Sequence, residues 1–299
     1  MIALAAVLAV VCAATPAPPP APDLAALWRD ACLWEVGSNA EKVPAARKAL
    51  IAEGDRVLDF LIPTKLDVKD TLVTRALQVV IGGIGRSAVP RLVPVLSSEI
   101  ANVRRNAADL LGTLGAVEAA PAIAKLLGDP DARLGALAAL AALKSRGTVS
   151  EVAEVMRGDA PERVRVTAAA TLGAIGGDAA VAALAVALAA RPAPLRFAAE
   201  QALVELKAVG VLRQRLGDAD KRVRLHAIAA LGRIADPVAR LDLLGLLEDR
   251  DPVVRGFAAG ALGTMLDEPS RRRLEARFAV ETDPFARGKV SAALAAAAR

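Results

Sequence analysis

The sequence predicts an all-α fold, a right-handed α-solenoid (superhelix) of tandem two-helix repeats. One Arg-containing segment recurs about every 30 residues, which favours a repeat array over two ordinary domains in a chain of 299 residues. Hydrophobic residues make up 55% of the chain but aromatic residues only 2%, so Ala, Leu and Val must build the core. Small side chains let helices approach closely, as stacked repeats require.

The first element along the chain is an apolar run over residues 1–14, followed by a Pro/Ala-rich stretch over residues 15–22. The run is too short for a membrane-spanning helix, which needs about 20 residues, but it fits a signal peptide without the usual leading Lys or Arg. We therefore expect a bacterial protein exported to the periplasm, with residues 15–22 as a linker.

Two alternatives stay open at this end. The first is a lipid anchor on Cys12, although Val11 stands where such signals usually have Gly or Ala. The second is an uncleaved N-terminus, which would leave the protein in the cytoplasm.

The next expected element is a capping helix within residues 23–42, ahead of a solenoid over residues 43–299 with about seven repeats and a terminal half repeat. An end repeat has one face without a neighbour, and that face must be sealed. Residues 23–36 carry Trp28, Cys32 and Trp34, so we expect one helix there. Cys32 is either a reactive thiol or a buried cap residue, and its place between two Trp favours burial.

One Arg marks each repeat, and a Leu follows it seven positions later. Gly follows this Leu in four copies and permits close helix contact, and a weaker copy without the Arg surrounds Thr74. Because each Arg holds the same place relative to a core Leu, we predict a structural ladder at repeat junctions and not an anion-binding stripe. The ladder consists of Arg104, Arg133, Arg165, Arg196, Arg224, Arg255 and Arg287.

Each repeat is expected to contain two helices. The first begins after Asp-Pro pairs, at Asp129, Asp251 and Asp283, and ends near a Gly such as Gly85, Gly115 or Gly176. The second carries apolar pairs four residues apart, which lie on one helix face. These pairs are Leu92/Leu96, Ile123/Leu127, Val152/Met156, Leu184/Leu188, Leu212/Leu216, Leu243/Leu247 and Leu274/Phe278.

The segment Asp251-Pro252-Val253-Val254-Arg255, followed by AAGALG over residues 258–263, resembles the HEAT repeat family in its short, bilin-lyase-like variety. The resemblance covers residues 43–299 and implies an armadillo-like solenoid without specifying an activity. In that family the repeated Asp and Arg bond from unit to unit. The matching pairs with a four-residue spacing here are Asp129/Arg133, Asp220/Arg224, Asp251/Arg255 and Asp283/Arg287.

No catalytic residue, cofactor site or metal site is predicted. His226 is the single histidine, which excludes a two-His metal site within one chain, and we expect it to pack or face solvent. The Gly-rich stretches at residues 81–85 and 175–177 follow helices and are read as helix ends, not phosphate loops. HEAT-like deoxyhypusine hydroxylases use His-Glu pairs, whereas Ala227 follows His226, and an exported protein would not meet the phycobiliprotein substrates of bilin lyases.

The resemblance implies that the second helices line a concave binding surface. Positions flanking their apolar pairs are then the predicted partner-binding residues: Arg91, Lys125, Glu151, Glu154, Ala183, Val186, Gln214, Arg215, Asp242, Arg273 and Arg277. Their mixed charge suits a protein or peptide better than nucleic acid, although the chain carries a net charge of +5. We therefore predict a non-catalytic scaffold or adaptor, expected to be monomeric and without a membrane span.

The alternative prediction is a nucleic-acid-binding protein that uses the basic patch formed by Arg271, Arg272, Arg273 and Arg277. Some HEAT-like DNA glycosylases have this architecture, but they place aromatic residues beside a basic groove. Here Trp28 and Trp34 lie near one end of the chain and the Phe residues are scattered along the sequence.

Overall fold

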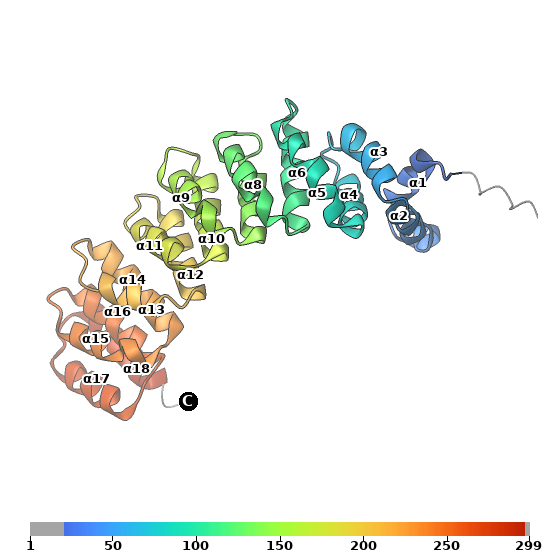
Figure 1. Cartoon of the computed structure of the whole chain (residues 1–299). Coiled ribbons are helices and arrows are strands. Elements are labelled where there is room, and N and C mark those ends of the chain that lie inside the picture. The colour runs from blue at the N-terminus through green and yellow to red at the C-terminus, as the bar shows by residue number, and fades with distance from the viewer. Residues whose placement is uncertain (1–20, 297–299) are drawn as a thin grey trace, which may run out of the picture.

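The computed structural model describes residues 21–296, and every regular element within them is a helix. Helices that follow one another in the sequence stack side by side into a curved arc, with α1 at one end and α18 at the other (Figure 1). The predicted all-α solenoid is therefore confirmed. The expected signal peptide and residues 15–20 of the linker lie outside the described residues.

The even-numbered helices, called the inner helices below, lead from one end of the arc to the other. In Figure 1, α10, α12 and α18 lie along its inner edge, and α9, α11 and α17 along its outer edge. The inner helices are α2 (Lys42–Ala52), α4 (Thr71–Ile84), α6 (Ala101–Thr113), α8 (Arg133–Leu143), α10 (Glu162–Ile175), α12 (Ala193–Glu205), α14 (Lys221–Ile234), α16 (Pro252–Gly263) and α18 (Pro284–Ala296).

The odd-numbered helices from α3 onward, called the outer helices, are shorter on average, and several are flanked by 3-10 turns. They are α3 (Asp55–Lys65), α5 (Val89–Leu92), α7 (Ala120–Ala124), α9 (Val149–Arg157), α11 (Asp178–Ala187), α13 (Val209–Arg215), α15 (Arg240–Gly245) and α17 (Glu268–Val280). The 3-10 turns are η1 (Gly37–Asn39), η2 (Arg86–Ala88), η3 (Pro94–Ser97), η4 (Val117–Ala119), η5 (Lys125–Gly128), η6 (Arg146–Thr148), η7 (Pro237–Ala239) and η8 (Leu246–Glu248).

The expected continuous second helix is broken in three repeats, over residues 86–97, 117–128 and 237–248. Pro90 and Pro121 lie in the first turn of α5 and α7, and Pro94 and Pro237 begin 3-10 turns. Proline lacks a backbone donor and disfavours helical geometry in the residue before it. These segments therefore change between α and 3-10 geometry.

The core follows the predicted repeat pattern. The Leu seven residues after each Arg is fully buried in six repeats, and only Leu294 near the C-terminus is partly exposed. Both members of each apolar pair on the outer helices are also buried, except for partly buried Phe278. Both helices of each repeat thus contribute buried apolar side chains to a continuous core, as expected for a solenoid.

The helix ends match the predicted signals with one exception. Gly85 and Gly176 end α4 and α10 with φ of 85° and 69°, a backbone conformation that favours glycine, and Gly115 lies just beyond α6. Asp251 accepts a 2.8 Å hydrogen bond from the Val253 N–H and caps α16. Asp129 instead caps a turn at Asp131, because α8 begins later, at Arg133.

Successive inner helices touch at glycine–alanine contacts. A Cβ at Gly112 would lie 3.0 Å from the Ala139 Cα, and one at Gly232 would lie 2.8 Å from both Cα and Cβ of Ala261. Gly173 and Gly263 meet the next inner helix in the same way. Because the repeats come closest on this side, the stack bends toward it, and the inner helices form the concave side.

The N-terminal cap is shorter than predicted. Helix α1 spans Leu24–Ala31, and Trp34 beyond it is 65% exposed, so the expectation of one helix through residue 36 is wrong. The buried Arg47 guanidinium donates to the Ala31 carbonyl at 3.1 Å and to Glu35 at 2.8 Å. These bonds hold the chain in a turn where the helix would otherwise continue. Trp28 is buried and seals the end of the core.

Among residues 21–296, no single helix is long and apolar enough to cross a membrane. Helix α4 and the segment that follows it, which ends at Ser97, are separated by a sharp bend. Only when these two halves are added together do their length and composition match those of a membrane-spanning segment.

Cys32 is expected to react slowly in the folded protein. Burial raises the pKa of its thiol from 9.0 to about 11, so little thiolate exists near pH 8. We expect iodoacetamide to alkylate Cys32 roughly a hundredfold more slowly in the native chain than in urea. Peptide mass spectrometry can follow Cys32 separately from Cys12. Equal rates in both states would contradict its placement in the cap.

Candidate partner-binding surface

The predicted partner-binding residues lie on the outer helices and their turns, from Arg91 in α5 to Arg277 in α17. The prediction that second helices line the concave side is therefore wrong, because the glycine–alanine contacts place the first helices there. Ala183 is also buried, whereas Val186 is 52% exposed on the convex side. The whole predicted set lies on the outer helices and on η5: Arg91, Lys125, Glu151, Glu154, Ala183, Val186, Gln214, Arg215, Asp242, Arg273 and Arg277.

Several charged members of that set pair with neighbours in the fold. Arg91 donates to Asp59, and Asp242 accepts from Arg213. Arg277 donates to Glu248 at 3.1 Å, joining two successive outer segments. These side chains link one repeat to the next.

The basic patch at residues 271–277 is also interleaved with carboxylates. Arg272 lies 3.0 Å from Glu268, and Arg271 lies 4.0 Å from the same carboxylate. Arg277 contacts both Glu248 and Glu281. Mixed charge of this kind is a poor match for a phosphate backbone, which favours one-signed contacts.

The Arg ladder closes the turn between each outer segment and the next inner helix. Arg104, for example, donates to the Ser98 and Glu99 carbonyls at 2.7 and 2.8 Å, and five ladder members donate to carbonyls five or six residues earlier in the chain. Arg165 donates to the Met156 carbonyl and Arg287 to the Phe278 and Glu281 carbonyls. The ladder thus satisfies carbonyls left without partners at helix ends.

Asp129 bonds to an Arg of the neighbouring repeat, as the resemblance implies, and not to the Arg133 side chain four positions later. The Arg133 backbone N–H, not its side chain, bonds to the Asp129 carbonyl at 2.8 Å. The Asp129 carboxylate contacts Arg104 of the preceding repeat at 2.6 Å. Burial raises the pKa of Asp129, but the Asp131 N–H and Arg104 outweigh it and hold that pKa below its ordinary range.

The most buried ion pair joins Arg255 of α16 to Glu281 after α17. Arg255 donates from Nε and Nη2 to the two carboxylate oxygens, each at 2.7 Å, and the Glu281 side chain has no exposed surface. Arg277 and the Asp283 N–H also donate to this carboxylate. Chiefly through Arg255, these donors lower the pKa of Glu281 from 4.5 to about 2.

His226 connects two inner helices through hydrogen bonds. The Arg196 Nε–H donates to its Nε2 at 3.2 Å, so the ring proton lies on Nδ1, 2.6 Å from the buried Glu200 carboxylate. Arg233 also contacts Glu200, at 3.3 Å. The expectation that His226 packs within the fold is met by these contacts and by the edge of the Phe197 ring, 5.2 Å away between centroids.

Replacing His226 by Ala is expected to lower the free energy of unfolding by about 1–3 kcal/mol, because Glu200 and Arg196 lose a partner at a partly buried junction. His226→Gln should recover part of the loss, since an amide offers both a donor and an acceptor. Urea denaturation followed by circular dichroism measures both variants. An Ala variant as stable as the wild type would show that the junction contributes nothing.

The concave side has a floor of small side chains. Five residues after the ladder Arg, each inner helix from α8 to α18 presents an Ala or Gly, except for Gln201 in α12. These positions, called the floor below, are Ala138, Ala170, Gln201, Ala229, Gly260 and Ala292, and all are exposed or half-buried. Another chain can approach the inner helices closely along such a floor.

Aromatic rings flank the floor in the C-terminal half. Phe197, His226, Phe257 and Phe285, called the aromatic row, lie on four successive inner helices, α12 to α18. Phe197 and Phe285 are 60% and 43% exposed, and the Phe257 and Phe285 rings lie 6.3 Å apart. The Phe residues are scattered along the sequence and meet only in the fold. Their positions, within two residues of a ladder Arg, were the signal that could have grouped them.

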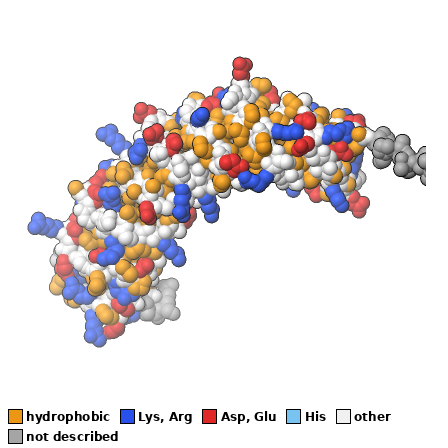
Figure 2. Space-filling model, in the orientation of Figure 1, with side chains coloured by type: hydrophobic (Ala, Val, Ile, Leu, Met, Phe, Trp, Pro, Cys, Tyr) orange, Lys and Arg blue, Asp and Glu red, His pale blue; other side chains and the backbone are white. Residues whose placement is uncertain are grey.

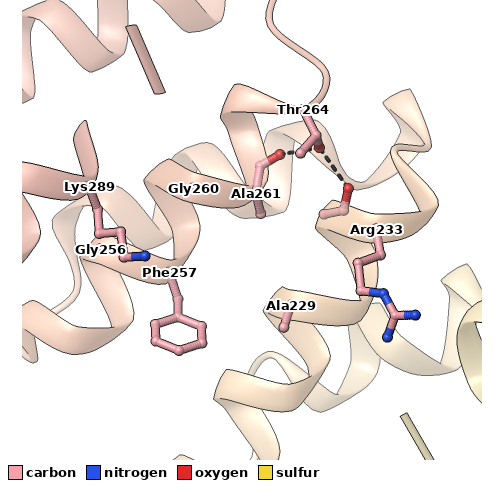
Figure 3. Close-up of a pocket in the computed structure, with 9 residues that line it drawn as sticks. Ala229, Arg233, Gly256, Phe257, Gly260, Ala261, Thr264 and Lys289 are labelled. Carbon is pink, nitrogen blue, oxygen red and sulfur yellow. Dashed lines mark hydrogen bonds between the residues drawn. The ribbon is translucent and has the colours of Figure 1, made fainter. Parts of the chain in front are cut away.

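A shallow cavity of about 200 Å³ lies beside Phe257, between α14, α16 and α18. Figure 3 shows Phe257 and Arg233 on opposite sides of Ala229, with Lys289 reaching over from α18. A Cβ at Gly260 would meet no atom within 4 Å, so open space lies above the floor at this point. The Thr264 hydroxyl lies 2.7 Å from the Gly232 carbonyl and 2.8 Å from the Ala261 carbonyl, and the single proton that these two oxygens share fixes the cavity wall.

Basic side chains predominate around the aromatic row. Arg222, Arg233 and Lys289 are exposed on α14 and α18. Arg222 pairs with Asp220 at 2.7 Å and Arg233 with Glu200 at 3.3 Å. Exposed Glu205 of α12 bonds to Gln201. Lys and Arg side chains also project from the inner edge of the arc in Figure 2. The described residues contain no cluster of three or more His, Cys, Asp or Glu side chains that could hold a metal ion. Basic side chains therefore flank the aromatic row. Among the described residues of this surface, Lys289 beside the Phe285 ring carries the positive charge that is not paired.

Comparisons with known proteins agree with this architecture. The chain has 16% identity to a Kap121p mutant structure with a TM-score of 0.50, covering 96% of this chain and 38% of that one. The CpcE–CpcF complex of phycocyanin lyase from Nostoc sp. PCC7120 gives 21% identity, coverage of 79% and 94%, and a TM-score of 0.41. Human deoxyhypusine hydroxylase gives 21% identity, coverage of 85% and 98%, and a TM-score of 0.36.

At 16% identity, the Kap121p structure shows similarity of fold alone. No curated protein matches the chain. The family model for HEAT repeats matches residues 58–134, 127–204 and 209–295, which together make up more than half of the sequence. The chain therefore belongs to the HEAT repeat family.

Proposed function

We propose that this protein is a non-catalytic scaffold that binds an extended segment of another protein along the concave side of its solenoid. The observation that carries the proposal is the aromatic row beside the floor, with Phe197 60% exposed. Exposed aromatic rings grouped on one concave surface are typical of binding surfaces. The small floor residues support it, because they leave room for a partner's backbone.

Affinity purification from the source cells, with quantitative mass spectrometry, tests this proposal. Arg substitutions at Ala138 and Ala170 on the floor would fill the concave side without touching the core. We expect them to remove specific co-purifying proteins that the wild type retains. The matched control places Arg at Val238 and Leu241, which are 59% and 79% exposed on η7 and α15. Loss of the same partners only in the control would overturn the proposal.

We also propose that the protein acts outside the cytoplasm, on the basis of the apolar run at residues 1–14. Cell fractionation with N-terminal mass analysis tests this directly. A periplasmic form that starts near Ala14 or Thr15 is expected. A form that starts at Met1 in the cytoplasm would exclude export and make a nucleic-acid partner accessible.

A further inference from the structure

We infer that the C-terminal half of the concave side binds an acidic peptide segment with apolar anchor residues. The inference rests on the proposed scaffold function and adds the chemistry of the partner. Its evidence comes from the aromatic row, the cavity beside Phe257 and the charges around them.

The aromatic row supplies two pairs of rings. The centroids within the pairs lie 5.2 and 6.3 Å apart, and one step between packed helices, about 8–10 Å, separates the pairs, so the row extends over roughly 20 Å. An extended chain advances about 3.3–3.6 Å per residue, and about six residues therefore cover that length. Phe257 and Phe285 form one pair of rings, and Phe197 with His226 the other.

The cavity beside Phe257 would bind one apolar anchor side chain of the peptide. Its lining includes Ala229, Gly256, Gly260 and the Phe257 ring. With a volume of about 200 Å³ and open space above Gly260, it fits an aliphatic or aromatic side chain better than a polar one. Such a side chain would pack on the Phe257 ring and exclude water from the floor (Figure 3).

Basic side chains beside the cavity favour acidic residues next to the apolar anchor of the peptide. Lys289 lies beside the cavity, with its ammonium group 5.8 Å from the Phe285 ring centroid, and has no carboxylate partner among residues 21–296. Arg233 lines the opposite wall, 46% exposed, although it also contacts Glu200. A partner carboxylate on either side of the apolar anchor would meet a positive charge, whereas a Lys or Arg would be repelled.

A selection from a displayed library of random dodecapeptides tests the inference. We expect peptides enriched by the wild-type protein to contain Leu, Ile, Phe or Trp flanked by Asp or Glu. Lys289→Glu should raise the Kd of an enriched peptide about tenfold, as measured by fluorescence anisotropy. Gly260→Leu should abolish its binding, because the new side chain fills the open space above the floor.

Lys289→Gln serves as the matched variant, since it removes the charge without reversing it, and it should weaken binding less than Lys289→Glu. Circular dichroism checks that each variant is folded. Enrichment of basic peptides, or enrichment that Gly260→Leu leaves unchanged, would overturn the inference. Either result would leave the scaffold proposal intact if Arg at Ala138 and Ala170 still removed cellular partners.

Discussion

Replacing Glu281 by Ala should lower the free energy of unfolding by about 3–5 kcal/mol, because the Arg255 guanidinium would stay buried without its carboxylate. Glu281 also accepts from Arg277 and from the Asp283 N–H, so the substitution leaves donors from three positions without a partner. Urea denaturation followed by circular dichroism measures the loss. As a control, Glu275→Ala removes an exposed carboxylate from α17, the helix that precedes Glu281, and should cost less than about 0.5 kcal/mol.

The contribution of Glu281 should also depend on pH in a defined direction. Its pKa is lowered from 4.5 to about 2, so the folded state holds the carboxylate ionised where the unfolded chain would bind a proton. The stabilisation is therefore complete above pH 4.5 and is lost as the pH falls toward 2. The difference between the wild type and Glu281→Ala should shrink over that range. A difference independent of pH would contradict the role of the ion pair.

The second large effect is expected at Gly232. A Cβ there would lie 2.8 Å from Cα and Cβ of Ala261, and this helix backbone cannot yield as a flexible side chain can. Gly232→Val should therefore destabilise the fold by about 3 kcal/mol and force α14 away from α16. Thermal and urea unfolding measure the loss, and small-angle X-ray scattering should detect a less curved arc.

Gly260→Ala provides the matched control for Gly232, because a Cβ at Gly260 meets nothing within 4 Å. Alanine favours a helix over glycine, so this variant should be about 0.5–1 kcal/mol more stable than the wild type. If both substitutions destabilised the protein equally, the close contact between inner helices would not be what shapes the concave side.

The periodic features of the fold could be predicted from the sequence because they are local. A core Leu seven residues after each ladder Arg, an Asp cap such as Asp251 and a terminating Gly such as Gly176 each act within one repeat. The breaks in the outer segments were harder to foresee, since Pro121 fits a first turn but gives no sign that α7 ends at Ala124.

The concave side was assigned to the wrong helices because curvature depends on spacing between repeats, which no single repeat specifies. The informative residues were the Gly after each core Leu, such as Gly112 and Gly232, which bring the inner helices together. The aromatic row was missed for a related reason. Phe197, Phe257 and Phe285 are far apart in the sequence and meet only when successive repeats stack.

A partner bound on the concave side would lie against the inner helices. A photo-crosslinking amino acid, p-benzoylphenylalanine, placed at Ala170 or Phe257 samples that side, and the same amino acid at Val238 or Leu241 samples the convex side. Irradiation in the source cells, followed by mass spectrometry, should give a discrete protein adduct from Ala170 and Phe257 alone. Adducts formed only from Val238 and Leu241 would show that the partner binds the convex side instead.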